Sequence, residues 1–417
     1  MDLVVYAVPF FVVAIFAELG YGLAKGRNTY RMNDSAGSLF MGTLSQARRF
    51  ATLGIGGYVY QQITDYFSLP LMDASQWFTW VLAFVVYDLC YYWFHRISHE
   101  RTLFWASHVA HHQSEDYNLT TALRQTSTGF LFGWVFYIPM YMLGVPAEVV
   151  ITVGSANLIY QFWVHSEHIP KLGWYEWVFV TASNHRVHHG QNDIYMDRNY
   201  GGVFILWDRL FGSFQEELDE EPCVYGIRGP LHSFNPVKAN LHIYIEMMVD
   251  CWRTRRWQDK LKIWVGRTGW RPADVAQRFP REKNDLATFE KYDPPTPKRI
   301  FWYVAFQLTA VVFALNGIAG SAFAYFAGFS QASLILATCI TTALWLQCGD
   351  PKATMKWELL RLTALFVLLA LGWQAGFDST TLVVLAVYGA VNLTLLPLMR
   401  NAAAVISAPQ LATTGPR

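Results

Sequence analysis

One stretch decides how this chain is organised, DLCYYWFHRISHERTLFWASHVAHHQSEDYNLTTALRQ, which spans residues 88–125. An apolar, aromatic run leads directly into five of the chain's twelve histidines, namely His95, His99, His108, His111 and His112. Residues three or four apart share one face of a helix. The HxxxH and HxxHH spacings can therefore gather several imidazoles on one side of a helix.

Two further histidine clusters follow along the chain, so ten of the twelve histidines fall between residues 95 and 189. They are HxxH at His165 and His168, and HxxHH at His185, His188 and His189. Imidazole nitrogen suits iron, zinc, copper and nickel, but one such ion takes at most about six donors. The number of histidines therefore predicts more than one metal ion.

Adjacent histidines point to a pair of ions. On a helix, neighbouring side chains diverge by about 100°, so His111 and His112 would each serve a different ion. The same holds for His188 and His189. We therefore expect two metals, each with about four histidines. His165 is a favoured ninth ligand, His168 fits the spacing but is not needed to complete the set, and His232 and His242 lie outside the pattern.

The composition indicates a membrane protein. Of 417 residues, 53% are apolar and only 15% are charged, against about 25% charged in a soluble protein. The 17 Trp, 22 Tyr and 29 Phe residues are typical of the aromatic belts found at membrane interfaces. The net charge of +1 gives no reason to expect nucleic acid as a partner. The five cysteines form no CxxC motif and are expected to be free thiols.

Apolar segments predict an all-α, polytopic membrane protein with eight to nine transmembrane helices, at about 20 residues per crossing. The segments are 3–23, 50–72, 77–94, 130–143, 147–163, 300–318, 322–347, 359–376 and 380–399. Gln61, Gln62 and Asp65 weaken the second segment, and Glu18 inside the first is expected to face the protein interior. The short segments 130–143 and 147–163 could instead form a partly inserted hairpin.

The charge distribution predicts the orientation. If the chain crosses the membrane nine times and its N-terminus lies outside, the outer loops lie near residues 66–76, 144–148, 318–322 and 376–380. None of these loops contains Lys or Arg. Basic residues favour the cytoplasmic side. The histidine clusters are therefore expected to face the cytoplasm, from a bacterial inner membrane or the endoplasmic reticulum.

The same segments suggest a five-part division of the chain. It comprises N-terminal membrane segments (1–75), a catalytic domain (76–220), a cytoplasmic or interfacial segment (221–298), a C-terminal transmembrane bundle (299–400) and a tail (401–417). Within the third part, the basic, Trp-bearing stretch 251–270 could lie flat on the membrane or form an ordinary solvated helix.

Acidic side chains are expected to compensate the metal charge or to orient the histidine rings. Glu115 and Asp116, directly after the second histidine box, are the first choice for this catalytic tuning. Asp88, Glu167 and Asp193 are further candidates. Asn184 precedes His185 and is expected to be either a donor to the site or a helix cap.

These motifs resemble the fatty acid hydroxylase/sterol desaturase superfamily of membrane di-iron enzymes, and most closely its alkylglycerol monooxygenase branch. The phrases that carry the resemblance are DLCYYWFHRISH (88–99), HHQSEDYNLTTALRQ (111–125), YQFWVHSEHIPKLGW (160–174), NHRVHHGQND (184–193) and NYGGVFILWDRLFGSF (199–214). The resemblance implies eight iron ligands: His95, His99, His108, His111, His112, His185, His188 and His189. It covers roughly residues 35 to 220.

The resemblance implies a monooxygenase that hydroxylates an alkyl or acyl lipid with O2. In the alkylglycerol branch, the carbon beside an ether oxygen is hydroxylated and tetrahydrobiopterin supplies electrons. Other branches use cytochrome b5 or ferredoxin-type donors. This chain carries no haem-binding HPGG motif and no iron–sulfur cysteine pattern, so its electrons are expected from an external reductant or redox protein.

Other functions compete with this interpretation. A lipid desaturase of the same superfamily would use the same oxidant. Whether the product is an alcohol or a double bond would depend on where a second C–H bond of the lipid lies. A membrane metal transporter would place its site near the bilayer midplane on broken helices, whereas these histidines fall at span ends and in polar segments. A zinc hydrolase needs only about three protein ligands and an open position. Eight or more histidines therefore suit oxygen activation by a metal pair better than zinc-dependent hydrolysis.

Overall fold

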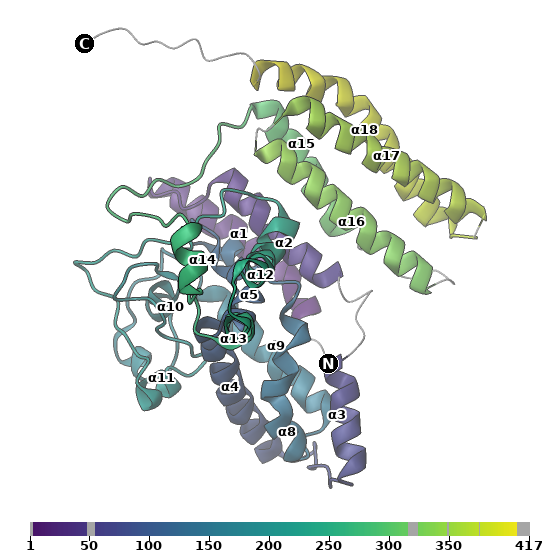
Figure 1. Ribbon diagram of the computed structural model, residues 1–417. Coiled ribbons are helices and arrows are strands. Elements are labelled where there is room, and N and C mark those ends of the chain that lie inside the picture. Colours follow the sequence, from purple (N-terminus) through teal and green to yellow (C-terminus); the bar gives the residue numbers. More distant parts are fainter. Residues whose placement is uncertain (1–2, 48–54, 316–323, 348–349, 375, 407–417) are drawn as a thin grey trace, which may run out of the picture. The chain divides into compact units, whose positions relative to one another are not determined.

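The computed structural model describes residues 3–47, 55–315, 324–347, 350–374 and 376–406 (Figure 1). Regular structure in these residues is helical, which confirms the all-α prediction. No strand occurs within the described ranges, where only isolated backbone bridges pair Arg101 with Arg267, Phe179 with Phe204 and Gly190 with Tyr225.

The chain forms two compact units. The first comprises residues 1–38, 52–232 and 238–291, and the second comprises 39–51, 233–237 and 292–417. Every residue named in a predicted site belongs to the first unit. The division into five parts remains a prediction, because compactness alone does not test it.

The first unit is built from two long apolar helices, α1 (Val4–Ala24) and α4 (Trp77–Glu100), several shorter helices and many loops. Its elements are α1 (Val4–Ala24), α2 (Met32–Ala47, which continues into the second unit), α3 (Ile55–Tyr66), α4 (Trp77–Glu100), α5 (Thr102–Ala106), α6 (Val109–His112), α7 (Leu119–Ala122), η2 (Gly129–Leu131), η3 (Gly133–Tyr137), α8 (Ile138–Met142), α9 (Ala147–Trp163), η4 (Gly173–Trp177), α10 (Ala182–His189), α11 (Leu206–Phe211), α12 (Pro236–Arg253), α13 (Trp257–Val265) and α14 (Ala273–Arg278).

Helix α4 is polar inside and apolar outside. It packs on α5, α9 and η3, and its buried positions include Asp88, His95 and His99. Large apolar side chains such as Trp77 and Val81 are exposed on the same helix. An apolar outer surface suits lipid, and polar groups in such a helix face the protein interior. The helix ends at Glu100, because Arg101 adopts an extended backbone conformation.

Glu18 of α1 is buried, as the sequence predicts. Its carboxylate accepts a hydrogen bond from the Leu119 backbone N–H at 2.8 Å, and also from the hydroxyls of Tyr30 and Ser166. These contacts connect α1 to the start of α7 and to the segment that follows α9. The acid therefore fixes the first helix against the part of the chain that carries the second and third histidine clusters.

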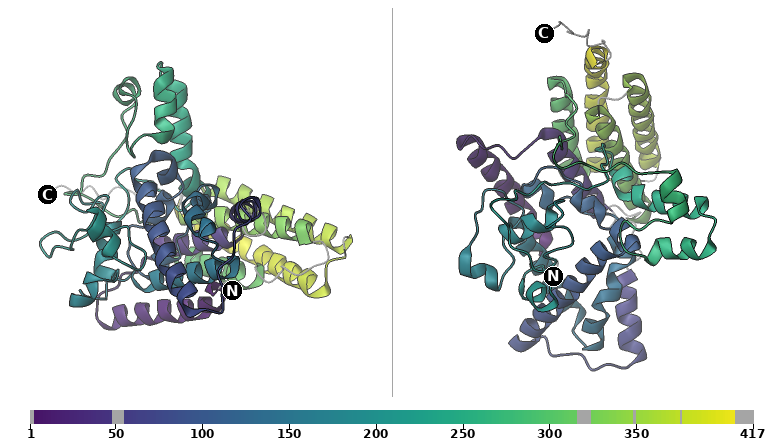
Figure 2. Two further views of the ribbon diagram at one scale, coloured as in Figure 1. Left: turned by 90° about the horizontal axis from the view of Figure 1, so that it is seen from below. Right: turned by 60° about the vertical axis from the view of Figure 1, so that its left-hand side comes forward.

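The second unit contains a helical bundle. Its elements beyond α2 are α15 (Lys298–Thr309), the π-helical η5 (Ala310–Leu315), α16 (Ala324–Leu346), α17 (Pro351–Gln374) and α18 (Ser379–Ile406). Helix α17 packs on both α16 and α18, and the three lie side by side in Figures 1 and 2.

A buried polar network crosses this bundle. The Arg361 guanidinium forms an ion pair with Glu358 and donates to the Asn392 side-chain oxygen at 2.7 Å. Gln307 donates to the same Asn392 oxygen at 2.6 Å and accepts from the Tyr388 hydroxyl, also at 2.6 Å. All five side chains are buried. One polar cluster thus connects α15, α17 and α18.

We expect Glu358→Ala to destabilise the bundle by about 3–5 kcal/mol, because it leaves the Arg361 charge buried without its counter-ion. Thermal unfolding in detergent should show a clear drop in Tm. Lys352→Ala, at an exposed position on the same helix, should unfold like the wild type. Equal Tm values for Glu358→Ala and the wild type would contradict a stabilising role for the pair.

Three helices of the described residues are long and apolar enough to cross a membrane: Tyr6–Ala24, Trp77–Glu100 and Ser379–Met399. Ser330–Leu346 is apolar but shorter. They support an integral membrane protein, whereas the predicted count of eight to nine spans is not confirmed. Residues 50–54, 316–318, 322–323 and 375 of the predicted segments lie outside the described residues.

The predicted span at 130–143 is not one continuous helix. The structure divides it into η2, η3 and α8, each of at most five residues. Pro139 at the start of α8 lacks the N–H that a continuing helix would need. Gly144, with a φ of 71°, then turns the chain back toward α9.

Candidate metal centre

Nine histidines converge from four places in the first unit. His95 and His99 lie in the last turns of α4, and His165 follows α9. Each of the two HxxHH boxes is carried by a short helix. His108 caps α6, which contains His111 and His112, and α10 contains His185, His188 and His189.

The nine side chains form two groups in which the ligand nitrogens lie within 4.8 Å of one another. The first group contains His95, His99, His108, His112 and His188. The second group contains His111, His165, His185 and His189. The neighbours His111 and His112 therefore lie in different groups, as do His188 and His189. The divergence of adjacent side chains on a helix accounts for this separation.

Backbone carbonyls, not carboxylates, orient four of the rings. Nδ1 of His95 lies 2.8 Å from the carbonyl oxygen of Tyr200. Nδ1 of His188 lies 2.9 Å from the carbonyl oxygen of Arg198. The Nδ1 atoms of His111 and His165 lie 3.0 and 2.8 Å from the carbonyl oxygens of Arg124 and Gln161. A carbonyl can only accept, so each Nδ1 carries the hydrogen and each neutral ring presents a bare lone pair at Nε2.

These bare lone pairs face each other. In the second group, the Nε2 atoms of His111 and His165 are 3.4 Å apart, although neither has a hydrogen to donate. In the first group, the Nε2 atoms of His95 and His108 are 3.1 Å apart, and Nε2 of His188 is buried without a hydrogen-bond partner. Two nitrogens about 2.1 Å from a shared metal ion are separated by about 3 Å. The donor set therefore fits a cation in each group.

Burial keeps the rings neutral. It lowers the pKa of His111 to about 4. It also lowers the pKa of the other histidines beyond α4 well below the ordinary value, namely His108, His112, His165, His185, His188 and His189. Neutral imidazole is the form that binds metal, so both groups are ready to bind cations at neutral pH.

Helix α10 is fixed by a cap at its start and by an arginine within it. Thr181 and Asn184 form a reciprocal capping box at its start, so Asn184 is a helix cap. The Arg186 guanidinium, beside His185, donates to the carbonyl oxygens of Ser166 and Ile169 at 2.9 and 2.8 Å. These bonds connect the second HxxHH box to the segment that carries His165.

Asp208 positions one of the orienting carbonyls. Its carboxylate accepts from the backbone N–H groups of Tyr200 and Gly201 at 2.7 and 2.8 Å, and the Tyr200 carbonyl then accepts from His95. Burial raises the pKa of Asp208 to about 6, against the lowering effect of these hydrogen bonds. The sequence prediction missed Asp208. The Gly-Gly-x5-Asp pattern at 201–208 is the signal that could have revealed it.

Asp88 anchors the same loop from the other side. It accepts from the backbone N–H groups of Val203 and Phe204 at 2.9 and 3.0 Å, and from the Trp207 indole at 2.9 Å. The Asn157 amide of α9 also donates to it at 2.6 Å. Asp88 therefore holds α4, α9 and the 203–207 segment together, and these four hydrogen bonds come from the loop and from α9, not from a histidine ring.

The predicted acids Glu115 and Asp116 are not members of either histidine group. Asp116 forms ion pairs with Arg31 at 2.9 Å and with Lys291 at 2.7 Å. Glu115 lies 3.7 Å from the Arg31 guanidinium. Both acids thus belong to a charged cluster next to α6, and their predicted tuning role remains a prediction.

The other candidate acids also pair with cations. Glu167 binds Arg27 at 3.1 Å, and Asp193 forms an ion pair with Arg228. Asp197 instead lies close to a histidine ring, with its carboxylate 3.9 Å from Nδ1 of His99. Sequence reasoning did not single out Asp197.

The remaining three histidines lie outside both groups. His168 packs edge-on against Tyr21, with ring centroids 5.2 Å apart. His242 interacts through Nδ1 with the Lys238 carbonyl at 3.2 Å. His232 is exposed, and this separation from the centre matches its predicted exclusion.

Comparison with known proteins gives two kinds of match. The fatty acid hydroxylase family model matches residues 80–213, which contain all nine grouped histidines. Human alkylglycerol monooxygenase is 36% identical over 384 residues, covering 89% of this chain and 83% of the relative. Alkylglycerol monooxygenase of Xenopus tropicalis is 38% identical over 296 residues, or 70% of this chain and 65% of the relative. No solved structure gives a significant match.

Proposed function

This chain belongs to the alkylglycerol monooxygenase family, and from that membership we propose that it is a membrane di-iron monooxygenase that hydroxylates a lipid chain with O2. The first substrate to test is an alkylglycerol ether lipid, as the relatives' name states for them. Hydroxylation beside the ether oxygen gives a hemiacetal, which breaks down to an aldehyde and a free glycerol.

One observation carries the proposal: two adjoining groups of neutral imidazoles lie at the C-terminal end of a helix with an apolar surface. His95 and His99 stand in the last turns of α4, which is long and apolar enough to cross a membrane. A lipid chain lying along such a helix can present a carbon to the histidine groups while it remains in the bilayer.

The ligand roles follow from the two groups. The five histidines of the first group would hold one iron, and the four of the second group, with His165 among them, would hold the other. Bound iron would supply the activation of O2 and the oxidising power needed for an unreactive C–H bond. The orienting carbonyls keep each Nδ1 protonated, so that each Nε2 lone pair is directed to its ion.

The charged cluster at Asp116 has a supporting role in this proposal. Asp34 accepts from the Glu115 backbone N–H at 3.0 Å and from the Ser114 hydroxyl. Together with the ion pairs of Asp116 to Arg31 and Lys291, these bonds fix the chain directly after His111 and His112. Glu115 and Asp116 would therefore act on the metal through the position of α6 and through their charge.

Oxygen-18 labelling tests the reaction. The membrane-embedded enzyme is supplied with 18O2, a reductant and an alkylglycerol, and the products are analysed by mass spectrometry. Label in the hemiacetal or in rapidly trapped aldehyde supports ether cleavage, whereas label in a stable alcohol of another lipid keeps the monooxygenase and changes the substrate. A new double bond without label indicates a desaturase, and hydrolysis without O2 excludes both reactions.

Metal analysis tests the centre. We expect about two iron ions per chain at neutral pH in protein made with ample iron, with Mössbauer spectra of a coupled pair. Zinc can replace iron in purified protein, because imidazole suits both metals. Spectra that show only mononuclear iron would contradict the two-ion site.

Acid should release the metal. Burial keeps the pKa of these rings below the ordinary 6.5, so they stay neutral at pH 7. His111, with a pKa of about 4, becomes protonated as the pH falls through 4. Protons then compete for the Nε2 lone pairs. We expect metal content after dialysis to be full at pH 7 and to fall as the pH drops through 4, beginning with the second group, which contains His111. Full retention well below pH 4 would argue against histidine ligands.

We further propose that the histidine groups face the cytoplasm. The support is the absence of Lys and Arg from the expected outer loops. Labelling of a single cysteine near Gln191, placed at the exposed position Ile194, should report the cytoplasmic side. Labelling from the outer side would reverse the orientation.

A further inference from the structure

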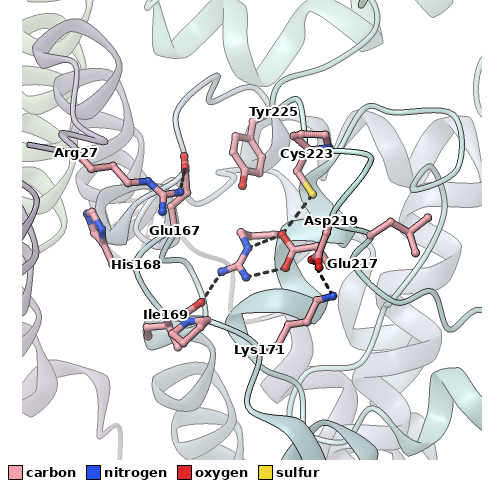
Figure 3. Close-up of a pocket in the computed structure, with 13 residues that line it drawn as sticks. Arg27, Glu167, His168, Ile169, Lys171, Glu217, Asp219, Cys223 and Tyr225 are labelled. Carbon is pink, nitrogen blue, oxygen red and sulfur yellow. Dashed lines mark hydrogen bonds and ion pairs between the residues drawn. The ribbon is translucent and has the colours of Figure 1, made fainter. Parts of the chain in front are cut away.

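A polar cavity of about 590 Å³ lies in the first unit, between the end of α1 and the segments 167–171 and 217–225 (Figure 3). Figure 3 shows Arg27, Glu167 and His168 on one side of the cavity and Glu217, Asp219 and Cys223 on the other, with Tyr225 between them. Sites for small molecules usually measure about 300–1,000 Å³. The volume therefore suits a small organic molecule and not a protein partner.

Two stacked tyrosines connect the cavity to the second histidine group. The Tyr225 ring, which lines the cavity, stacks on Tyr117 with centroids 4.8 Å apart and an interplanar angle of 14°. Tyr117 in turn stacks on the His165 ring, with centroids 5.6 Å apart and an angle of 26°. An unbroken series of aromatic rings therefore runs from the cavity to a proposed iron ligand.

The chain holds this series rigidly. Tyr117 is fully buried, and its hydroxyl donates to the carbonyl oxygen of Val164, the residue before His165, at 2.9 Å. Tyr225 pairs through its backbone with Gly190, the residue after His189. The Gln191 amide also donates to the Tyr225 carbonyl at 3.0 Å. Both rings are thus fixed to segments that end in histidines of the second group.

The same packing closes the cavity to lipid. None of the nine grouped histidines lines the cavity, and Tyr117 and Tyr225 are packed in contact between it and His165. A lipid carbon cannot pass through two rings in van der Waals contact, whereas electrons can cross such a contact. The cavity can therefore exchange electrons with the centre through these rings but cannot deliver a substrate carbon.

We propose that this cavity binds a small, polar, two-electron reductant and that Tyr225 and Tyr117 conduct its electrons to the second histidine group. The inference rests on the proposed function, because a monooxygenase needs external electrons. Inserting one oxygen atom of O2 into a C–H bond and releasing the other as water consumes two electrons and two protons. A reduced heterocycle that becomes oxidised by two electrons and loses two protons balances the reaction.

The lining supplies groups of both hydrogen-bonding types. Arg27 and Lys171 are donors, and Glu167 and Asp219 are acceptors, in ion pairs of 3.1 Å each. His168 also lines the cavity, and its Nε2 is buried without a hydrogen-bond partner among the described residues. Paired donors and acceptors beside an aromatic wall suit a heterocycle that carries amide-like and amine-like edges.

A binding measurement tests the cavity. Tetrahydrobiopterin, supplied anaerobically and without lipid to the iron-loaded full chain, is the probe for equilibrium dialysis. Arg27 and Lys171 are partly exposed, so an Arg27→Ala/Lys171→Ala double variant should fold. We expect its Kd for tetrahydrobiopterin to rise at least tenfold. Lys283→Ala, exposed and outside the cavity, should bind like the wild type.

A kinetic measurement tests the tyrosines. In stopped-flow experiments, Tyr225→Leu should slow reduction of the oxidised iron centre by tetrahydrobiopterin at least tenfold, whereas Tyr225→Phe, which keeps the ring, should stay near the wild-type rate. A single turnover of dithionite-reduced Tyr225→Leu with alkylglycerol and O2 should proceed normally. A purely structural role of Tyr225 would impair that turnover as well.

Two results would overturn the inference. One is unchanged tetrahydrobiopterin binding in the double variant together with unchanged reduction in Tyr225→Leu. The other is reduction only by a cytochrome- or ferredoxin-type protein with no tetrahydrobiopterin bound. Failure of the proposed function would give a different result, because dithionite-reduced wild-type enzyme would then leave the lipid unoxidised. Tetrahydrobiopterin binding and iron reduction would still change in these variants.

Discussion

His188→Ala is expected to reduce monooxygenase activity by more than about 100-fold, the upper range for loss of an outer partner of a metal ligand. His188 is the only residue of α10 in the first group. Its Nδ1 is fixed by the Arg198 carbonyl, and its buried Nε2, without a hydrogen-bond partner among the described residues, is available to that group. Iron content should fall toward one ion per chain.

His111→Ala tests the second group in the same way, because the Nε2 atoms of His111 and His165 face each other at 3.4 Å. We expect an equally large loss of activity. His232→Ala is the matched control, because His232 is exposed and outside both groups, and it should keep most of the activity. Full activity and two bound irons in His188→Ala would refute the ligand assignment.

Gly202→Ala is expected to have the second-largest effect. A Cβ at this position would lie 2.8 Å from both the Asp88 carboxylate and the Tyr91 ring, and 3.0 Å from the Asn157 side-chain oxygen. Asp88 cannot yield easily, because it holds the 203–207 segment by three hydrogen bonds. The loop would have to shift, and the orienting carbonyl of Tyr200 would move with it.

The expected cost of this overpacking is about 1–3 kcal/mol in stability. Misdirection of His95 should weaken iron binding by about 10–100-fold. Thermal unfolding and iron titration measure the two effects. Gly229→Ala is the control, since a Cβ there meets nothing within 4 Å. Normal iron affinity in Gly202→Ala would show that the Tyr200 carbonyl does not position His95.

Much of the centre could be read from local spacing. HxxxH on α4 and HxxHH on α6 and α10 are short-range patterns, and helix geometry alone separates His111 from His112 and His188 from His189. The structure places these residues in the two groups that this argument expects. The apolar runs likewise predicted α1, α4 and α18, because a continuous apolar stretch of about 20 residues depends on composition and length only.

Long-range contacts explain what the sequence did not reveal. The carbonyls that orient His95 and His188 lie at residues 200 and 198, about 100 and 10 positions away in the chain. Every residue has a backbone carbonyl, so no residue type indicates which carbonyls accept a hydrogen bond from a histidine ring. Carboxylates such as Asp88 looked like partners of the histidines, but they bind loop N–H groups instead.

The sequence by itself determined the helical class, the membrane character and the nine histidines, because periodicity and composition are properties of neighbouring residues. Only the tertiary structure decided which nitrogen of each ring faces the centre, how the loop at 200–208 supports His95, and that Tyr225 and Tyr117 stack between a polar cavity and His165. The contact of His95 with residue 200 and the stacking of Tyr117 on Tyr225 each join segments about 105 to 108 residues apart, and their positions depend on how the whole unit packs.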